Sequence, residues 1–387
     1  MSIIYLDNAA TSFPKPPDMM KAMEKYSREI GANPGRSGHG LSIDAGRVIY
    51  ETREALGRLF HIEDPLRISL TKNATEALNI ALLGSLHSGD HVITTSMEHN
   101  SVMRPLRYLA SCGVELTVVP CSPQGDLDPD DISKAFKRNT KLVVMTHASN
   151  VTGTILPIAE AGRIIREKDD VLFCVDAAQT AGVLPIDVEQ MYIDVLAFTG
   201  HKSLYGPQGT GGLYIRKSLD KKIKPLMMGG TGSRSEFEEQ PDFMPDKYES
   251  GTPNTVGFAG LLAGLNFLFK QSLAAVRRQE IRLVARFLER MDDLRDCVTV
   301  YGVNDATRQT AVVSFNIRNM TPSDAALSLE EQHGILCRPG LHCAPSAHRT
   351  LGTFPQGTVR FSFGYFTGEA DIDKAAAAVR NLAQKGI

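Results

Sequence analysis

The stretches FCVDAAQTAG (173–182) and VLAFTGHKSLYGPQGTGG (195–212) decide the fold of this chain. Each begins as an apolar run of strand length and then turns polar, the first at Asp176 and the second near Lys202. A lysine beside an apolar strand is unusual, because burial of an ammonium group is costly. One interpretation is a surface lysine that follows a strand and pairs with a carboxylate. The other is a reactive amine that forms a Schiff base with pyridoxal phosphate (PLP) while Asp176 faces the pyridinium nitrogen.

Strand-like and helix-like segments alternate on both sides of these stretches. One predicted strand starts at Ile68, and the others span 91–97, 114–120, 141–150, 171–179 and 194–202. Predicted helices lie near 18–30, 43–60, 74–86 and 158–168, and a further helix starts at about 130. This alternation predicts an α/β fold with a large, doubly wound, mostly parallel sheet. Ligands of such sheets bind at the carboxyl ends of the strands. We therefore expect one crevice lined by the residues at those ends: His99, Asn150, Asp176, Gln179 and Lys202.

The C-terminal third has a different order of helices and strands, which predicts a smaller α+β domain. Its segments are helices near 255–271 and 272–293, a strand at 310–317, a helix near 322–333, a strand at 358–366 and a helix from about 369. Residues 1–17 predict an extended arm, because prolines at 14, 16 and 17 oppose a helix. We predict a large domain of residues 16–270 and a small domain formed by 1–15 and 271–387. The polar, Gly/Pro-rich segment 229–254 is long for a connection, which favours a functional or interface role.

Composition limits the class of protein. The chain has 387 residues, 42% of them hydrophobic, and a net charge of −2, which argues against general nucleic-acid binding or a membrane-surface role. We find no apolar run of membrane-spanning length and no signal peptide. Six cysteines lie apart, without disulfide or metal-ligand spacing, so we expect no metal site and a reducing, cytoplasmic setting.

Two further residues each allow a structural and a functional interpretation. Thr75 lies in the first turn of a predicted helix, where it can cap the helix or help to bind an anion. Cys343 follows His342 and lies close to Arg338 in sequence. It can be a small buried apolar residue, or a thiolate nucleophile favoured by neighbouring positive charge.

Ten motifs, in order between residues 5 and 366, together resemble one known family. They are YLDNAAT, GRSGHGLS, NATEALN, MEHNS, ASNVTGTI, VDAAQT, TGHKSLYGPQG, ESGTPNT, CRPGLHCAP and VRFSFGYF. The chain resembles the class V aminotransferase-like PLP enzymes, and within them the group II cysteine desulfurases and selenocysteine lyases. The resemblance implies a fold-type-I PLP-dependent transferase and a homodimer.

The resemblance also implies the residues of a cofactor site. Lys202 would carry PLP, Asp176 would keep the pyridine nitrogen protonated, and His99 would stack on the ring. The ring hydroxyl oxygen would be bound by Asn150 and Gln179. The phosphate would be held by Ala74, Thr75, Thr199, His201 and, from the other subunit, Thr252.

The resemblance further implies how substrate is bound and sulfur is accepted. Arg360 would bind the substrate carboxylate, and Cys343 would accept the sulfur. Further substrate contacts would come from Asn150, Arg338, Arg36 and His39, the last two from a loop that borders the partner's site. Ser203 is an extra residue after Lys202, and Pro339 and Leu341 replace the threonine and the first histidine of the family's RTGHHC. These departures leave substrate preference and the acceptor open.

The expected function is that of a PLP-dependent cysteine desulfurase. It would convert L-cysteine to L-alanine with Lys202, His99 and Cys343 as catalytic residues, and a persulfide on Cys343 would pass to a sulfur-acceptor protein. The alternatives are a lyase acting on L-selenocysteine, a C–S lyase that releases pyruvate, and a poorly catalytic sulfur-trafficking scaffold. A nicotinamide dehydrogenase is disfavoured, because no GxGxxG follows a strand and opens a helix.

Overall fold

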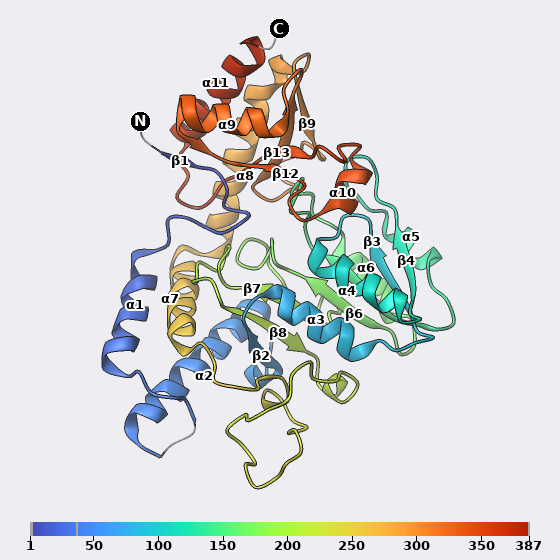
Figure 1. Ribbon diagram of the computed structural model, residues 1–387, viewed down its shortest axis with the longest axis vertical. Helices are drawn as coiled ribbons and strands as arrows, with labels where there is room; N and C mark the ends of the chain where they lie inside the picture. Colours follow the sequence, from blue (N-terminus) through green and yellow to red (C-terminus); the bar gives the residue numbers. More distant parts are fainter. Residues whose placement is uncertain (1–2, 36–37, 386–387) are drawn as a thin grey trace.

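A seven-stranded sheet dominates the structure, a computed structural model that describes residues 3–35 and 38–385 (Figure 1). Its strand order is β2-β8-β7-β6-β5-β3-β4. The strands are Ile68–Thr71 (β2), His91–Thr95 (β3), Glu115–Val119 (β4), Thr140–Thr146 (β5), Leu172–Asp176 (β6), Val195–Thr199 (β7) and Gly211–Ile215 (β8). β8 pairs antiparallel with β2 and β7, and all other pairs are parallel. The predicted α/β fold with a mostly parallel sheet is therefore confirmed.

Helices cover both faces of this sheet, and each face has its own apolar core. α2, α5, α6 and α7 contribute to one core cluster, and α3 and α4 to the other. α1 packs along α7 (Figure 1). These helices are Pro17–Glu29 (α1), Gly40–Phe60 (α2), Ala74–Ser85 (α3), Asn100–Ser111 (α4), Pro129–Lys134 (α5), Ile158–Arg166 (α6) and Thr255–Gln271 (α7). The two cores establish the doubly wound arrangement.

The central strands end earlier than the sequence pattern predicts. β6 and β7 are buried along their whole length, as expected of strands covered on both faces. The predicted strand at 171–179 ends at Asp176, and the predicted strand at 194–202 ends at Thr199. Beyond these points the chain leaves the sheet in turns. The polar residues that follow are therefore loop residues, free to face a crevice at the carboxyl edge.

A second, four-stranded antiparallel sheet lies above the first in Figure 1, with the order β12-β13-β10-β9. Its strands are Val298–Tyr301 (β9), Val312–Ile317 (β10), Arg338–Gly340 (β12) and Thr358–Ser362 (β13). A separate pair joins β1 (Ile4–Tyr5) to β11 (Ile335–Leu336) in parallel. The accompanying helices are Leu273–Met291 (α8), Pro322–His333 (α9), Pro345–Thr350 (α10) and Glu369–Lys385 (α11). Five of these elements are not predicted from the sequence, because they are too short to show a clear periodicity: β1, β9, β11, β12 and α10.

The N-terminal arm packs with the second sheet. Ile4 and Leu6 belong to the same core cluster as Phe287, Phe315 and Phe361. The arm ends one residue earlier than predicted, because Pro17 is the first residue of α1, a position where proline fits a helix. This packing supports the predicted small domain of 1–15 and 271–387, and we retain that division as a proposal.

α7 and α8 meet at a sharp bend of 79°. Ser272 lies between them with φ of 68°, and its side chain accepts a hydrogen bond from the Ala275 N–H. Among the described residues no single helix is long and apolar enough to cross a membrane, and only this bent pair together meets that length and composition.

Candidate active site

A cavity of about 210 Å³ lies where the carboxyl ends of the parallel strands face β12 and β13. All five strand-end residues that we expected in one crevice line it. The predicted site residues in the lining are Ala74, Thr75, His99, Asn150, Asp176, Gln179, Thr199, His201, Lys202, Arg338 and Arg360. The structure therefore gathers side chains from both sheets around one space.

Lys202 reaches this cavity from the turn that follows β7. Burial lowers the pKa of Lys202 to about 8, while the Asp176 carboxylate acts in the opposite direction. The N-terminal arm holds the turn: the Ser12 hydroxyl donates to the Lys202 carbonyl at 2.8 Å, and the Lys15 ammonium donates to the His201 carbonyl at 2.7 Å. Lys202 thus has a substantial neutral fraction near pH 8 and can act as a nucleophile or a base.

Asp176, the last residue of β6, is only 4% exposed. Burial raises the pKa of this carboxyl, while the Ala178 N–H, which donates to its Oδ1 at 2.9 Å, and the charge of Lys202 act against the rise. Such a buried carboxyl is stabilised in its charged form when a cation is placed beside it.

His99 caps the N-terminus of α4. Its Nδ1 accepts the Ser101 N–H at 3.0 Å, so the neutral ring carries its proton on Nε2. Burial, followed by the charge of Lys202, lowers the pKa of His99 to about 4. The imidazole is therefore neutral near pH 7, with an N–H available for proton transfer.

The start of α3 forms one end of the cavity. Asn73 caps this helix, with its Oδ1 accepting the Glu76 N–H at 2.9 Å, and Ala74 and Thr75 form the first turn. The Thr75 hydroxyl lies 2.7 Å from that of Ser101. Nearby, His201 has a buried Nδ1 without a hydrogen-bond partner in the described chain. First-turn N–H groups, hydroxyls and an unused ring nitrogen suit an anion such as phosphate.

Two guanidinium groups form another part of the lining. Arg338 on β12 and Arg360 on β13 are direct partners in the antiparallel register. Arg360 is 1% exposed, and its Nη1 donates to the Asn150 carbonyl at 3.0 Å. Two arginines on facing strands provide planar donors for a carboxylate.

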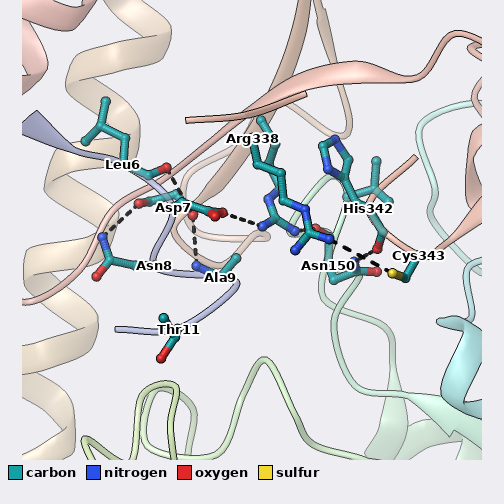
Figure 2. A network of polar contacts seen from close by, with 12 residues as sticks. Leu6, Asp7, Asn8, Ala9, Thr11, Asn150, Arg338, His342 and Cys343 are labelled. Carbon is teal, nitrogen blue, oxygen red and sulfur yellow. Dashed lines mark hydrogen bonds and ion pairs between the residues drawn. The ribbon is translucent and has the colours of Figure 1, made fainter. Parts of the chain in front are cut away.

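Cys343 lies next to the cavity, although it is not one of the described lining residues. It is exposed, and its Sγ is 4.0 Å from Arg338 Nη2 (Figure 2). Both His342 and Cys343 have left-handed φ angles, 49° and 58°. Two hydrogen bonds hold this turn: Asn150 Nδ2 donates to the His342 carbonyl, and the Asn100 N–H donates to the Cys343 carbonyl, each at 2.7 Å. These bonds hold the backbone of the turn, which places the exposed thiol near an arginine.

Two of the predicted site residues, Thr252 and His39, lie away from this cavity. Thr252 lines a separate cavity of about 200 Å³ beside the start of α7. His39 is exposed and caps α2, where its Nδ1 accepts the Ser42 N–H. Arg36 lies outside the described residues. Since Thr252, His39 and Arg36 were all assigned to a site shared with a partner subunit, their predicted roles stay predictions.

The three departures from the family motifs fit the local structure. Ser203 lies in the turn after Lys202 and contacts a different, small pocket. Pro339 is on β12, an edge strand, where its missing N–H is tolerated. The Leu341 carbonyl accepts the Ala344 N–H in the turn that leads to α10.

Sequence reasoning missed several residues of the cavity, including Asn73, Ser101 and His342. Asn73 could have been found as a helix cap, and Ser101 from its place two residues after His99. It also missed the partner of Arg360: Asp7, whose Oδ1 lies 2.7 Å from Arg360 Nη2. No sequence spacing predicts a pair 353 residues apart.

A larger hollow of about 860 Å³ lies between α8 and β9, a strand of the four-stranded sheet. The described residues that line it include Glu289, Asp292 and Arg295, but no lysine, histidine or cysteine. It therefore lacks the amine and imidazole groups that Lys202 and His99 bring to the 210 Å³ cavity.

Comparison with known proteins agrees with this geometry. The model of the class-V aminotransferase family matches residues 4–375. A probable cysteine desulfurase of Pyrococcus abyssi is 36% identical over 98% of this chain and 94% of its own length. The apo structure of a cysteine desulfurase from Thermococcus onnurineus superposes with a TM-score of 0.92 at 34% identity, covering 99% of this chain and 95% of that one. The cysteine desulfurase CsdA from Escherichia coli gives 0.86 at 27% identity, covering 98% and 94%. The family and fold implied by the sequence resemblance are confirmed.

Proposed function

The chain belongs to the class-V aminotransferase family, in the branch of the cysteine desulfurases, and from this premise we propose that it uses PLP to convert L-cysteine to L-alanine while Cys343 accepts the sulfur. The observation that carries the proposal is the convergence of Lys202, Asp176 and two arginines on one cavity, with an exposed cysteine beside it.

The lining residues fit PLP. Lys202 supplies an amine with a lowered pKa, Asp176 a buried carboxylate for the pyridinium nitrogen, and His99 a neutral ring. The phosphate would be held by Ala74, Thr75, Thr199 and His201, and the ring hydroxyl oxygen by Asn150 and Gln179. Bound PLP supplies an electron sink for negative charge that develops at the substrate Cα.

The chain's own residues divide the remaining work. Arg360 and Arg338 orient the substrate through its carboxylate. The Lys202 amine would act as a neutral base that removes the Cα proton. Asp176 would keep the pyridine nitrogen of bound PLP protonated, since a buried carboxylate is strongly stabilised by an adjacent cation. His99, with its Nε2–H, moves a proton to or from the substrate sulfur.

Cys343 completes the sulfur transfer. Its thiolate attacks the substrate Sγ, a new S–S bond forms, and the Cβ–Sγ bond breaks with its electron pair remaining on Cβ. Protonation of Cβ then produces the methyl group, and the Lys202 ammonium returns a proton to Cα, which completes L-alanine. Arg338, 4.0 Å away, stabilises negative charge on the sulfur atoms. We propose that the persulfide, on an exposed residue, passes to a thiol-bearing acceptor protein.

Product analysis tests this function against its rivals. Incubation of the PLP-loaded protein with L-cysteine should yield L-alanine, together with persulfide on the protein or sulfide when a thiol is added. Pyruvate and ammonia as the main products would instead establish a C–S lyase. Conversion of L-selenocysteine alone would establish a selenocysteine lyase.

We further propose a homodimer with shared active sites, in which Thr252 completes the partner's phosphate site. Thr252 lies in the long segment between β8 and α7. This segment exposes the apolar side chains of Leu226, Met228 and Phe237, which suit an interface.

Subunit mixing tests this assembly. Lys202→Ala and Thr252→Glu should each be inactive, the second because a carboxylate would repel the phosphate. Random mixing of the two should restore about a quarter of wild-type activity, since half of the dimers would be hybrids with one intact site each. Recovery of no activity, with hybrid dimers verified by mass spectrometry, would show that the sites are not shared.

A further inference from the structure

The part of the cavity lined by Arg338 and Arg360 contains more positive than negative charge. Arg338 and Arg360 are opposite each other on β12 and β13, and like charges in that position repel. Within the described chain, the carboxylate paired with these arginines is Asp7, at 2.7 Å from Arg360 Nη2. Two guanidinium groups and one carboxylate leave one net positive charge, which matches a single substrate carboxylate.

Asp7 is held in place by the backbone of the N-terminal arm. The arm runs beside β13: the Ser362 N–H donates to the Leu6 carbonyl at 2.7 Å, and the Asn8 N–H donates to the Ser362 carbonyl at 3.3 Å. The Asn8 side chain adds a bond to the same carbonyl at 3.0 Å. Asp7 is thereby paired in parallel with Ser362, which lies two residues after Arg360 on β13. The ion pair is therefore built into the fold.

Asp7 approaches Arg360 from outside the cavity. Of the described residues, those lining the cavity include Arg360 but not Asp7. In Figure 2, Asp7 and Cys343 lie on opposite sides of Arg338. Asp7 thus remains paired while a ligand carboxylate binds from the cavity side. Its charge partly neutralises Arg360, and its hydrogen bond fixes the guanidinium plane.

We propose that Asp7 is the built-in counter-ion of Arg360, a positioning residue that fixes this arginine toward the cavity and limits how tightly it holds the amino-acid carboxylate. This inference rests on the proposed function for the identity of the ligand. A moderate affinity for the carboxylate allows L-alanine to dissociate after each cycle, because product and substrate have the same carboxylate. Burial lowers the pKa of Arg360 and the Asp7 charge opposes that shift, as expected of a buried guanidinium beside a half-buried carboxylate.

Two ligands that differ only in the carboxylate test this role. Asp7→Asn keeps an oxygen acceptor for Arg360 but removes the charge. The PLP-loaded variant should bind L-alanine about tenfold more tightly than wild type, because a nearby negative charge is lost. Ethylamine, which is L-alanine without its carboxylate, should bind within about twofold of wild type. Calorimetric titration gives both dissociation constants, and neither requires turnover.

Thermal unfolding provides a second readout. Ligand-free Asp7→Asn should unfold at a lower temperature, because the buried Arg360 charge loses its compensating negative charge. L-alanine should raise the melting temperature of the variant more than that of wild type. The matched control is Asp220→Asn, which breaks another largely buried pair at 2.7 Å, with Arg67, outside the cavity. It should lower stability without changing either dissociation constant.

The outcomes separate the possible roles. Unchanged L-alanine binding in Asp7→Asn would make Asp7 purely structural, and weaker binding would make it purely orienting, so either result overturns the proposal. If Asp7→Asn does not fold, Asp7→Glu provides the test, because it keeps the negative charge. Its affinity for L-alanine should stay within about threefold of wild type. A tenfold change in that affinity would contradict the proposal. Failure of wild type to produce L-alanine from L-cysteine would refute the proposed function without affecting this binding comparison.

Discussion

Lys202→Ala should lose L-cysteine turnover by about 10³-fold or more, because in the proposed function this one side chain would supply both the covalent attachment of PLP and the base at Cα. Borohydride treatment of the wild-type protein should fix the cofactor on Lys202, and the variant should show no such adduct. Absorbance of the bound cofactor and peptide mapping by mass spectrometry measure both effects.

Lys15 provides an internal comparison for this experiment. Burial lowers the pKa of Lys15 to about 8, the same value as that of Lys202. The Lys15 ammonium, however, donates to Ser12 Oγ at 2.8 Å and to the His201 carbonyl at 2.7 Å, and it does not belong to the described cavity lining. If a low pKa alone selected the lysine, both would be labelled. Labelling on Lys15 instead of Lys202 would refute the assignment, since only placement distinguishes the two amines.

The sequence predicts much of the fold because its signals are local. Buried central strands form continuous apolar runs, and the polar residue that ends each run marks the carboxyl edge of the sheet, as at Asp176. That rule alone predicts that His99, Asn150 and Lys202 share one crevice, and all three line the 210 Å³ cavity. It fails for two- and three-residue strands such as β1 and β12, whose pairing partners decide their structure.

The least predictable parts of the site depend on contacts between distant segments. Asp7 and Arg360 meet because the arm lies along β13, and no local pattern encodes that approach. Likewise, the carbonyl of His342 is held by Asn150, and that of Cys343 by the start of α4, so the position of the thiol follows from three segments of the chain. A sequence motif identifies Cys343 as a candidate, but the structure establishes what surrounds it.

Cys343→Ala should lower conversion of L-cysteine to L-alanine by about 10³-fold or more, because the cofactor has no nucleophile that can accept the sulfur. The variant should still take up PLP and still bind L-cysteine, since Cys343 is not among the described residues that line the cavity. Spectral titration with L-cysteine measures binding, and quantification of L-alanine measures turnover. Turnover of L-selenocysteine should fall less, because the C–Se bond is weaker and selenium is a better leaving group.

Two other cysteines are matched controls, each sharing one property with Cys343. Cys112 is exposed as Cys343 is, but it lies at the far end of α4 from the cavity. Cys337 is six residues earlier in sequence, and burial raises its pKa to about 12, so it remains a thiol at neutral pH. Cys112→Ala and Cys337→Ala should each keep wild-type turnover within about twofold, as expected of residues outside the reaction path.

The location of the persulfide decides between the remaining readings of this site. After one round with L-cysteine and alkylation, mass spectrometry should place the additional sulfur on Cys343, a fixed thiol whose Sγ is 4.0 Å from Arg338 Nη2. A persulfide on Cys112 would mean that exposure alone selects the acceptor, and a persulfide on Cys337 would mean that sequence proximity does. Either result would contradict a role for the hydrogen-bonded turn at Cys343. Wild-type L-alanine production by Cys343→Ala would mean that sulfur leaves directly to solvent, and the arginine beside Cys343 would then serve the substrate carboxylate alone.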